Sequence, residues 1–253
     1  MSSQRIANVN DAKNLLKGAS LNTAASQIMV NSLNDTNLMG CMGADVDQLE
    51  TDDVTLSSLI LDASGSMQNV EQIVRDSFDE LVQALKESKQ SGSMLVSSRT
   101  FATKEKILHG FKKVEEIDKI DNQYVANGSS TALYDTLINA MSGIKSYSEQ
   151  LKASGIRTKC IVVVFSDGED NDSRHIAKDV KTISDELVKS EMFYLVYVGY
   201  GTDLDHIAAE VGFPNKMTTT KDASQIRKTM GLVSKSIIRA SQTQIGKPNS
   251  FFS

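Results

Sequence analysis

Short apolar runs alternate with longer segments of helical periodicity from residue 54 onward. Residues 54–61 form a mainly apolar run, and residues 161–165 are five apolar residues in succession, which is typical of a central strand covered on both faces. Between residues 70 and 85, apolar side chains recur at intervals of three and four, which indicates an amphipathic helix. This alternation predicts an α/β fold.

The remaining segments complete the predicted sheet and its helices. Residues 94–101 and 107–111 favour two strands joined by a charged turn, a hairpin that would place one antiparallel strand at an edge. Residues 112–123 are rich in charge, and we expect a solvated connection there. Ser130 or Thr131 is a candidate cap for the next helix. Further helices are predicted near residues 133–147, 173–189, 204–211 and 226–238, and further strands near 192–199 and 216–219.

The two ends of the chain differ in composition from the middle. The first 50 residues lack aromatic side chains, and two short helices are permitted by their apolar residues, among them Leu15, Leu16, Ile28 and Met29. So small and weakly apolar a segment is not expected to fold alone. We expect residues 1–52 to form a helical extension on a main domain of residues 53–241, with disorder before partner binding as the alternative. Residues 242–253 are expected to be a loose tail in which Phe251 or Phe252 could dock.

Composition and charge narrow the class of protein. The 253 residues are 40% hydrophobic and 23% charged, as in ordinary globular proteins. The net charge of −5 argues against nucleic acid as a partner. There is no apolar stretch long enough to span a membrane and no apolar segment near the start, so we expect a cytoplasmic protein with no membrane partner. Cys160 is expected in the core, and a disulfide between Cys41 and Cys160 is possible but disfavoured in that compartment.

Oxygen-bearing side chains follow two of the predicted strands. Asp62, Ser64 and Ser66 alternate in the loop after residues 54–61, a spacing that can turn three side chains toward one point. Asp167 comes just past the end of residues 161–165, where open α/β sheets bind their ligands. Oxygen ligands alone favour a hard cation, Mg²⁺ first and Mn²⁺ or Ca²⁺ next.

Three segments, in this order, resemble the metal-ion-dependent adhesion site of von Willebrand factor A domains. They are Asp-x-Ser-x-Ser at residues 62–66, the Gly-Ser-Ser-Thr loop at 128–131, and the apolar strand followed by Ser-Asp-Gly at 161–168. The resemblance implies a Rossmann-like, doubly wound, mostly parallel sheet with one antiparallel edge strand. It also implies that Ser64 and Ser66 bind the cation directly, that Asp62 and Asp167 act mostly through water, and that Thr131 joins when the site is engaged.

The same resemblance implies a function without bond making or breaking. Neutral hydroxyl ligands leave the cation's charge poorly compensated, so an Asp or Glu of a partner protein would complete its coordination. The chain is similar to stand-alone intracellular members of the family, of bacterial or phage type, which often work beside ATPases or in multiprotein complexes. We therefore expect an adaptor or scaffold that is not an enzyme.

Two alternative functions remain open. A phosphohydrolase could use Asp62 as its nucleophile, but a haloacid-dehalogenase type would require a second Asp where Ser64 stands, and a Walker phosphate loop is absent. A metal-free structural scaffold is the second alternative, in which the five residues are ordinary turn and capping residues. The scattered histidines give no zinc spacing, and a solvated loop is favoured over a second cation site for the acidic residues Glu169, Asp170 and Asp172.

Overall fold

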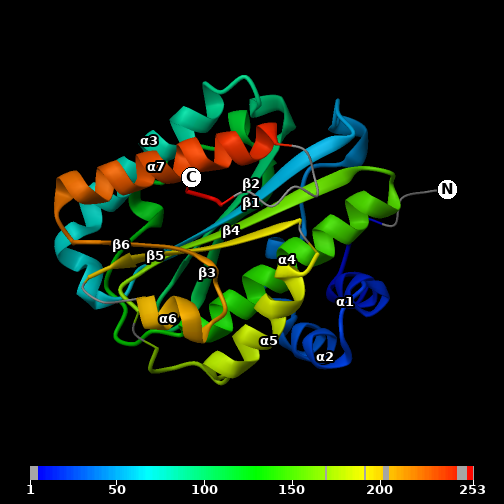
Figure 1. The fold of residues 1–253 in the computed structure, drawn as a ribbon, viewed down its shortest axis with the longest axis horizontal. Helices are drawn as coiled ribbons and strands as arrows, with labels where there is room; N and C mark the ends of the chain where they lie inside the picture. The colour runs from blue at the N-terminus through cyan, green and yellow to red at the C-terminus, as the bar shows by residue number, and fades with distance from the viewer. Residues whose placement is uncertain (1–4, 169, 191, 202–204, 244–249, 253) are drawn as a thin grey trace.

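A six-stranded sheet forms the centre of the computed structural model, which describes residues 5–168, 170–190, 192–201, 205–243 and 250–252 (Figure 1). The strand order is β3-β2-β1-β4-β5-β6. All neighbouring pairs are parallel except β2 and β3, which form the predicted antiparallel hairpin at one edge. The strands are β1 (Asp53–Asp62), β2 (Met94–Phe101), β3 (Glu105–Lys113), β4 (Arg157–Ser166), β5 (Phe193–Tyr200) and β6 (Asn215–Thr219). The predicted fold class is therefore confirmed.

The register of β1 and β4 brings their carboxyl ends to the same place. Leu61 lies opposite Phe165 in this parallel pair, so Asp62 and Ser166 leave the sheet side by side. From Cys160 to Ser166 every residue is fully buried, as expected for a central strand with helices on both faces. The loops that follow these two strands are thus neighbours, although about a hundred residues separate them in sequence.

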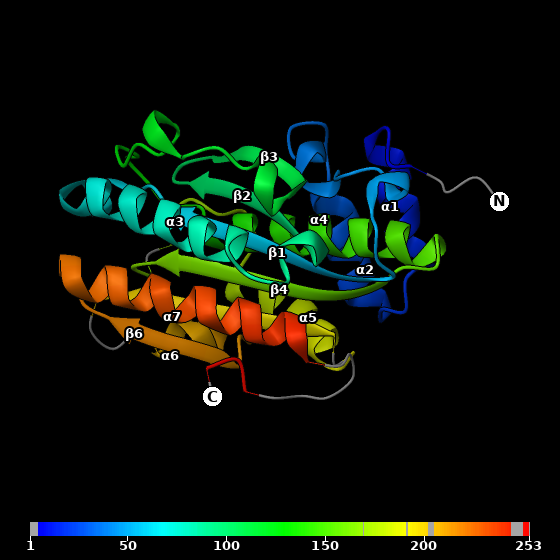
Figure 2. The ribbon, with the colours of Figure 1, turned by 90° about the horizontal axis from the view of Figure 1, so that it is seen from above.

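Helices cover both faces of the sheet. One face carries α3 (Glu71–Lys86) and α7 (Ala223–Gln242), which lie side by side in Figure 2. The other carries α4 (Leu133–Ala153) and α5 (Ala177–Val188), onto which α1 (Val9–Gly18) and α2 (Thr23–Ser32) pack, while α6 (Asp205–Glu210) precedes β6. Short 3₁₀ helices occupy Leu38–Cys41, Val46–Gln48, Gly65–Val70, Ser91–Ser93, Val114–Glu116 and Asp121–Gln123.

The N-terminal helices share the core of the sheet. Leu16 of α1 and Met29 of α2 are fully buried in the cluster that also contains Ile144 of α4. The contact between the segment after α2 and α4 is so close that a Cβ on Gly143 would lie 2.3 Å from the carbonyl oxygen of Gly40. Residues of the first segment therefore cover one face of α4 that would otherwise be exposed.

Several sequence predictions can be compared with these elements. The stretch of residues 112–123 is not a solvated connection, because Val114, Ile117 and Ile120 are buried in the core on the α3 face. Phe251 of the tail does dock, as the sequence allowed, because it is 1% exposed and packs against Tyr194 with ring centroids 5.9 Å apart. Residues 244–249 of that tail lie outside the described residues. Finally, α5 begins at Ala177, later than predicted.

Candidate metal centre

Asp62 ends β1 as a buried carboxylate with both oxygens engaged. Its Oδ1 accepts a hydrogen bond from the backbone N–H of Ser64 at 2.9 Å, and its Oδ2 accepts one from the hydroxyl of Ser166 at 2.6 Å. Asp62 is only 1% exposed. This burial raises the pKa of its carboxyl, although the two hydrogen bonds act to lower it. Asp62 therefore fixes the start of the loop that carries the two serines.

The two seryl hydroxyls connect Asp62's loop to Asp167. The Oγ atoms of Ser64 and Ser66 are 3.0 Å apart, and the Ser66 hydroxyl donates a short hydrogen bond to Oδ2 of Asp167. Ser64 is buried, whereas Ser66 is exposed, so the pair opens to solvent on the Ser66 side. Four of the five residues nominated from the sequence thus lie in one hydrogen-bond network.

The other carboxylate oxygen of Asp167 has no partner in the part of the chain that the structure describes. Its Oδ1 is buried and makes no hydrogen bond to any described residue. A buried charged oxygen without a partner is costly, so this atom requires a water molecule or a cation. Hydroxyl and carboxylate oxygens in this arrangement fit a hard divalent cation. In the described part of the chain no group of three His, Cys, Asp or Glu side chains could hold a metal, so binding here would depend on the hydroxyls.

A third loop is anchored to the first by a close backbone contact. The N–H of Gly65 donates to the carbonyl of Gly128 at 2.8 Å, and the N–H of Gly128 donates to the carbonyl of Ala63 at 3.2 Å. Gly128 also lies against the β2–β3 turn, where an added Cβ would be 2.1 Å from the Cβ of Ala102. Only glycine fits at this position, which explains the glycine of the predicted motif.

Thr131 joins the centre through its backbone. Its N–H donates to Oδ1 of Asn171 at 2.7 Å, and its carbonyl accepts hydrogen bonds from the N–H groups of Asn171 and Asp172. Thr131 is 1% exposed, but its hydroxyl makes no hydrogen bond to the side chains of the other four nominated residues, all of which are described. The structure therefore attaches Thr131 to the loop of Asp167 without including its hydroxyl in the network.

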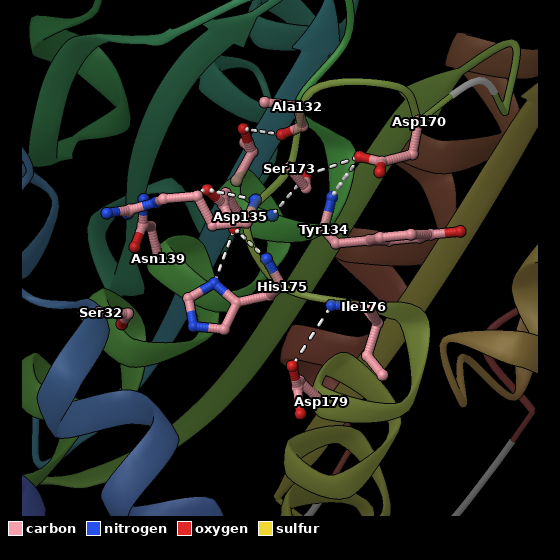
Figure 3. Close-up of polar contacts among 12 residues, drawn as sticks. Ser32, Ala132, Tyr134, Asp135, Asn139, Asp170, Ser173, His175, Ile176 and Asp179 are labelled. Atoms are coloured by element: carbon pink, nitrogen blue, oxygen red, sulfur yellow. Dashed lines mark hydrogen bonds and ion pairs between the residues drawn. The ribbon is translucent and has the colours of Figure 1, made fainter.

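The acidic loop after β4 caps α4. Oδ1 of Asp170 accepts hydrogen bonds from the N–H of Tyr134 at 3.2 Å and from the hydroxyl of Ser173 at 2.6 Å, and that hydroxyl in turn accepts the N–H of Asp135 at 3.1 Å (Figure 3). The cap predicted at Ser130 or Thr131 is wrong, since α4 begins after Ala132 without a side-chain cap of its own. Asp170 therefore has a structural role, and Glu169 lies outside the described residues.

Asp135 holds the far end of the same loop. Its Oδ1 accepts hydrogen bonds from the backbone N–H and the Nδ1–H of His175, at 3.0 and 2.6 Å (Figure 3). Its Oδ2 accepts two hydrogen bonds from Arg174. Burial opposes ionisation of Asp135, but these hydrogen bonds outweigh it and hold the pKa of the carboxyl below its usual value. Arg174 and His175 thus lie in the loop before α5, which begins at Ala177 after the extended Ile176, whose N–H donates to Oδ2 of Asp179.

Lys221 is a member of the centre that the sequence did not indicate. Its Nζ lies 2.9 Å from Oδ2 of Asp167 and 3.0 Å from the carbonyl oxygen of Ser66. Lys221 stands between β6 and α7, 54 residues from Asp167 and 155 from Ser66. A single lysine in a loop belongs to no motif, so only the fold reveals its position.

Comparison with known proteins agrees with this architecture. The sequence profile of the von Willebrand factor type A domain matches residues 58–231. No curated protein sequence matches the chain. Among solved structures, a von Willebrand factor type A protein from Catenulispora acidiphila has a TM-score of 0.55 at 11% identity, covering 74% of this chain and 43% of that one.

Two further structural relatives are a matrix protein with an occupied metal site and a pilus adhesin. Proximal thread matrix protein 1 from the mussel byssus, with a zinc-occupied MIDAS motif, has a TM-score of 0.53 at 18% identity, covering 75% of this chain and 46% of that one. The pilus adhesin SpaC from Lactobacillus rhamnosus GG has a TM-score of 0.57 at 12% identity, covering 76% and 30%. The chain thus spans less than half the length of each of these three proteins. Identities this low show the fold alone, but the sequence profile covers more than half of the chain, and the chain therefore belongs to the von Willebrand factor type A domain family.

Proposed function

We propose that this protein is a protein-binding module that recognises an acidic residue of its partner through a divalent cation, Mg²⁺ in the first place. The observation that carries the proposal is the network of Asp62, Ser64, Ser66 and Asp167, in which one buried oxygen of Asp167 has no hydrogen-bond partner among the described residues. Von Willebrand factor type A domains generally mediate protein–protein interactions, which supports the same role here.

The residues of the centre are proposed to have different roles in binding the cation. Asp62, whose two oxygens are already engaged by Ser64 and Ser166, orients the loop rather than offering a free oxygen. The hydroxyls of Ser64, Ser66 and Thr131 and the carboxylate of Asp167 are the oxygens proposed to hold it. When bound, Mg²⁺ supplies positive charge and an open position for a carboxylate from outside. Because Ser66 is exposed, a partner can reach the centre from that side.

Calorimetry with Mg²⁺ tests the metal centre directly. Titration into chelator-treated protein is expected to release or absorb heat with a saturable isotherm, and Asp167→Ala is expected to abolish it. Asp53→Ala is the matched control, because Asp53 lies at the opposite end of β1 in an exposed ion pair with Arg157. Absence of heat with the unchanged protein would leave the metal-free scaffold as the function.

The partner is proposed to be a protein in a multiprotein assembly of the cytoplasm, such as one that contains an ATPase. Both cysteines are buried free thiols, which is the usual state in a reducing compartment. Capture of partners from a cell lysate with Mg²⁺, with chelator, and with the Asp167→Ala variant tests this part of the proposal. Proteins retained only with Mg²⁺ and only by the unchanged chain are the expected result.

Burial disfavours the phosphohydrolase alternative. Asp62, its proposed nucleophile, is 1% exposed and has both carboxylate oxygens occupied by hydrogen bonds, so neither is free to attack a phosphorus atom. A generic phosphatase substrate with Mg²⁺ or Mn²⁺ is expected to show no turnover. Turnover that Asp62→Asn abolished would replace the binding function with the enzymatic one.

A further inference from the structure

Lys221 brings a further loop to the centre, in addition to those of Ser66, Gly128 and Asp167. Its ammonium group donates to Oδ2 of Asp167 and to the carbonyl of Ser66, and thereby connects the segment before α7 to both of them. The side chain is 33% exposed, while that of Asp167 is 8% exposed. Both groups therefore interact in a partly desolvated place, where an ion pair is screened less than on an open surface.

The ammonium group of Lys221 and a divalent cation would compete for the negative charge of Asp167. Asp62 has both oxygens engaged, so Asp167 is the carboxylate of the centre with an unpartnered oxygen. Lys221 neutralises that carboxylate from its Oδ2 side. A second cation placed beside Oδ1 would meet a carboxylate already paired and a positive charge only a few bond lengths away.

We propose that Lys221 is a built-in counter-ion of Asp167 that sets the cation affinity of the centre, and that a bound divalent cation displaces its ammonium group. The inference rests on the proposed function, since it assigns a competitor to the same metal centre. Lys221 acts through Asp167 and is a positioning residue that contributes no ligand. In the absence of the cation it compensates the buried charge of Asp167, and in its presence it limits the affinity.

Substitution of Lys221 by Met tests the competition by calorimetry. Removal of one charged hydrogen bond to Asp167 is expected to lower the dissociation constant for Mg²⁺ about tenfold. Lys221→Arg keeps the charge and is expected to restore the affinity of the unchanged protein to within about twofold. Lys216→Met is the matched control, because Lys216 also pairs with an aspartate at 2.9 Å, Asp205, but makes no contact with the centre.

Thermal unfolding separates this role from a merely structural one. Without metal, Lys221→Met is expected to unfold at a lower temperature than the unchanged protein, because Asp167 loses its counter-ion. Saturating Mg²⁺ is expected to remove that difference, since tighter ligand binding stabilises the folded state more. A purely structural lysine would lower the unfolding temperature equally with and without Mg²⁺, and that outcome would overturn the inference.

The possible results distinguish failure of this inference from failure of the function. If the unchanged protein binds Mg²⁺ and Lys221→Met binds it equally or more weakly, the metal centre stands and the counter-ion role is wrong. If neither protein binds Mg²⁺, the proposed function fails and this inference with it. Binding by Lys221→Met alone would support the counter-ion role, but it would overturn the Mg²⁺-dependent function of the unchanged protein.

Discussion

Asp62 illustrates how one residue can favour function over stability. Its carboxylate is buried, and burial raises its pKa, so keeping the charged form in the folded protein costs free energy of folding. An asparagine could still accept the hydrogen bond from the N–H of Ser64 and donate to the hydroxyl of Ser166. We expect Asp62→Asn to weaken Mg²⁺ binding in calorimetry, because the loop keeps its orientation but the centre loses a negative charge, while the free energy of unfolding without metal, measured in urea, stays equal or increases. Unchanged Mg²⁺ affinity in this variant would show that Asp62 does not belong to the centre.

Gly128 ties the loop of Thr131 to the rest of the centre. A methyl group there would lie 2.1 Å from the Cβ of Ala102, so Gly128→Ala must push the loop away from Ala63 and Gly65. We expect this change to cost about 1–3 kcal/mol of unfolding free energy and to weaken Mg²⁺ binding. The double variant with Ala102→Gly removes the clash and should recover both quantities in a double-mutant cycle. Additive effects of the two substitutions would contradict this account.

At this scale the sequence nominated residues but not their contacts. The spacing of Asp62, Ser64 and Ser66 after an apolar run was sufficient to indicate an oxygen-lined loop, and Asp167 followed from the end of a second strand. That Ser66 bonds to Asp167, and that Lys221 joins them, depends on the pairing of β1 with β4 and on the path of β6. Contacts between residues so far apart carry no signal in a single sequence.

The elements themselves were largely predictable, with an instructive exception between β3 and α4. β4 and α3 were predictable because their sequence patterns are clear. β4 contains a continuous apolar run, and the apolar residues of α3 recur at helical intervals. Val114, Ile117 and Ile120 are spaced by three within a charged stretch, and their burial was missed because the charges between them dominate the composition. Lys86 of α3 completes this packing by donating to the carbonyl of Ile117 at 2.6 Å.

The edge strand β3 is expected to make stability sensitive to acid through His109. Burial of the ring, with Lys112 nearby, lowers its pKa below the unfolded value of 6.5 although its Nδ1 lies 2.8 Å from the carbonyl oxygen of Gly110. Below pH 6.5 the unfolded chain therefore binds more protons than the folded one, and the free energy of unfolding falls as pH falls toward the lower folded pKa.

His109→Gln removes this titrating group. Urea unfolding between pH 7 and pH 5 is expected to show a smaller loss of stability in the variant than in the unchanged protein. His206→Gln changes a histidine elsewhere in the fold, in α6, and serves as the comparison. An identical pH dependence for His109→Gln and the unchanged protein would mean that the ring is not desolvated in the folded state.

At the scale of the whole molecule, the open question is whether residues 1–52 belong to the domain that they precede. We propose that they form an extension of it. Ile6 donates its N–H to Oε1 of Gln150 at 2.8 Å, and the hydroxyl of Ser32 lies 3.3 Å from that of Ser142, so the segment contacts α4 along much of its length. Its apolar residues Ala12, Leu16 and Met29 are fully buried in the core shared with α4 and β4.

The same packing places α1 beside the half of α4 that is remote from the metal centre. The hydroxyl of Ser146, which lies 3.4 Å from the carbonyl oxygen of Ala12, is in the second half of α4, whereas Thr131 precedes the helix. At 1.5 Å per residue, about 20 Å of helix separates these two points. Stability and metal affinity should therefore respond differently to a change in the extension.

Leu16→Ala tests both parts of this argument. If the extension and the sheet unfold together, the cavity left by Leu16 is expected to cost about 2–5 kcal/mol and to accelerate hydrogen exchange of the β4 amides as much as that of α1. Mg²⁺ affinity is expected to stay unchanged under conditions where the variant is folded. Leu232→Ala, the same substitution at a 38% exposed position of α7, should cost little. Exchange that accelerates in α1 but not in β4 would instead make the extension a separate unit docked on a complete domain.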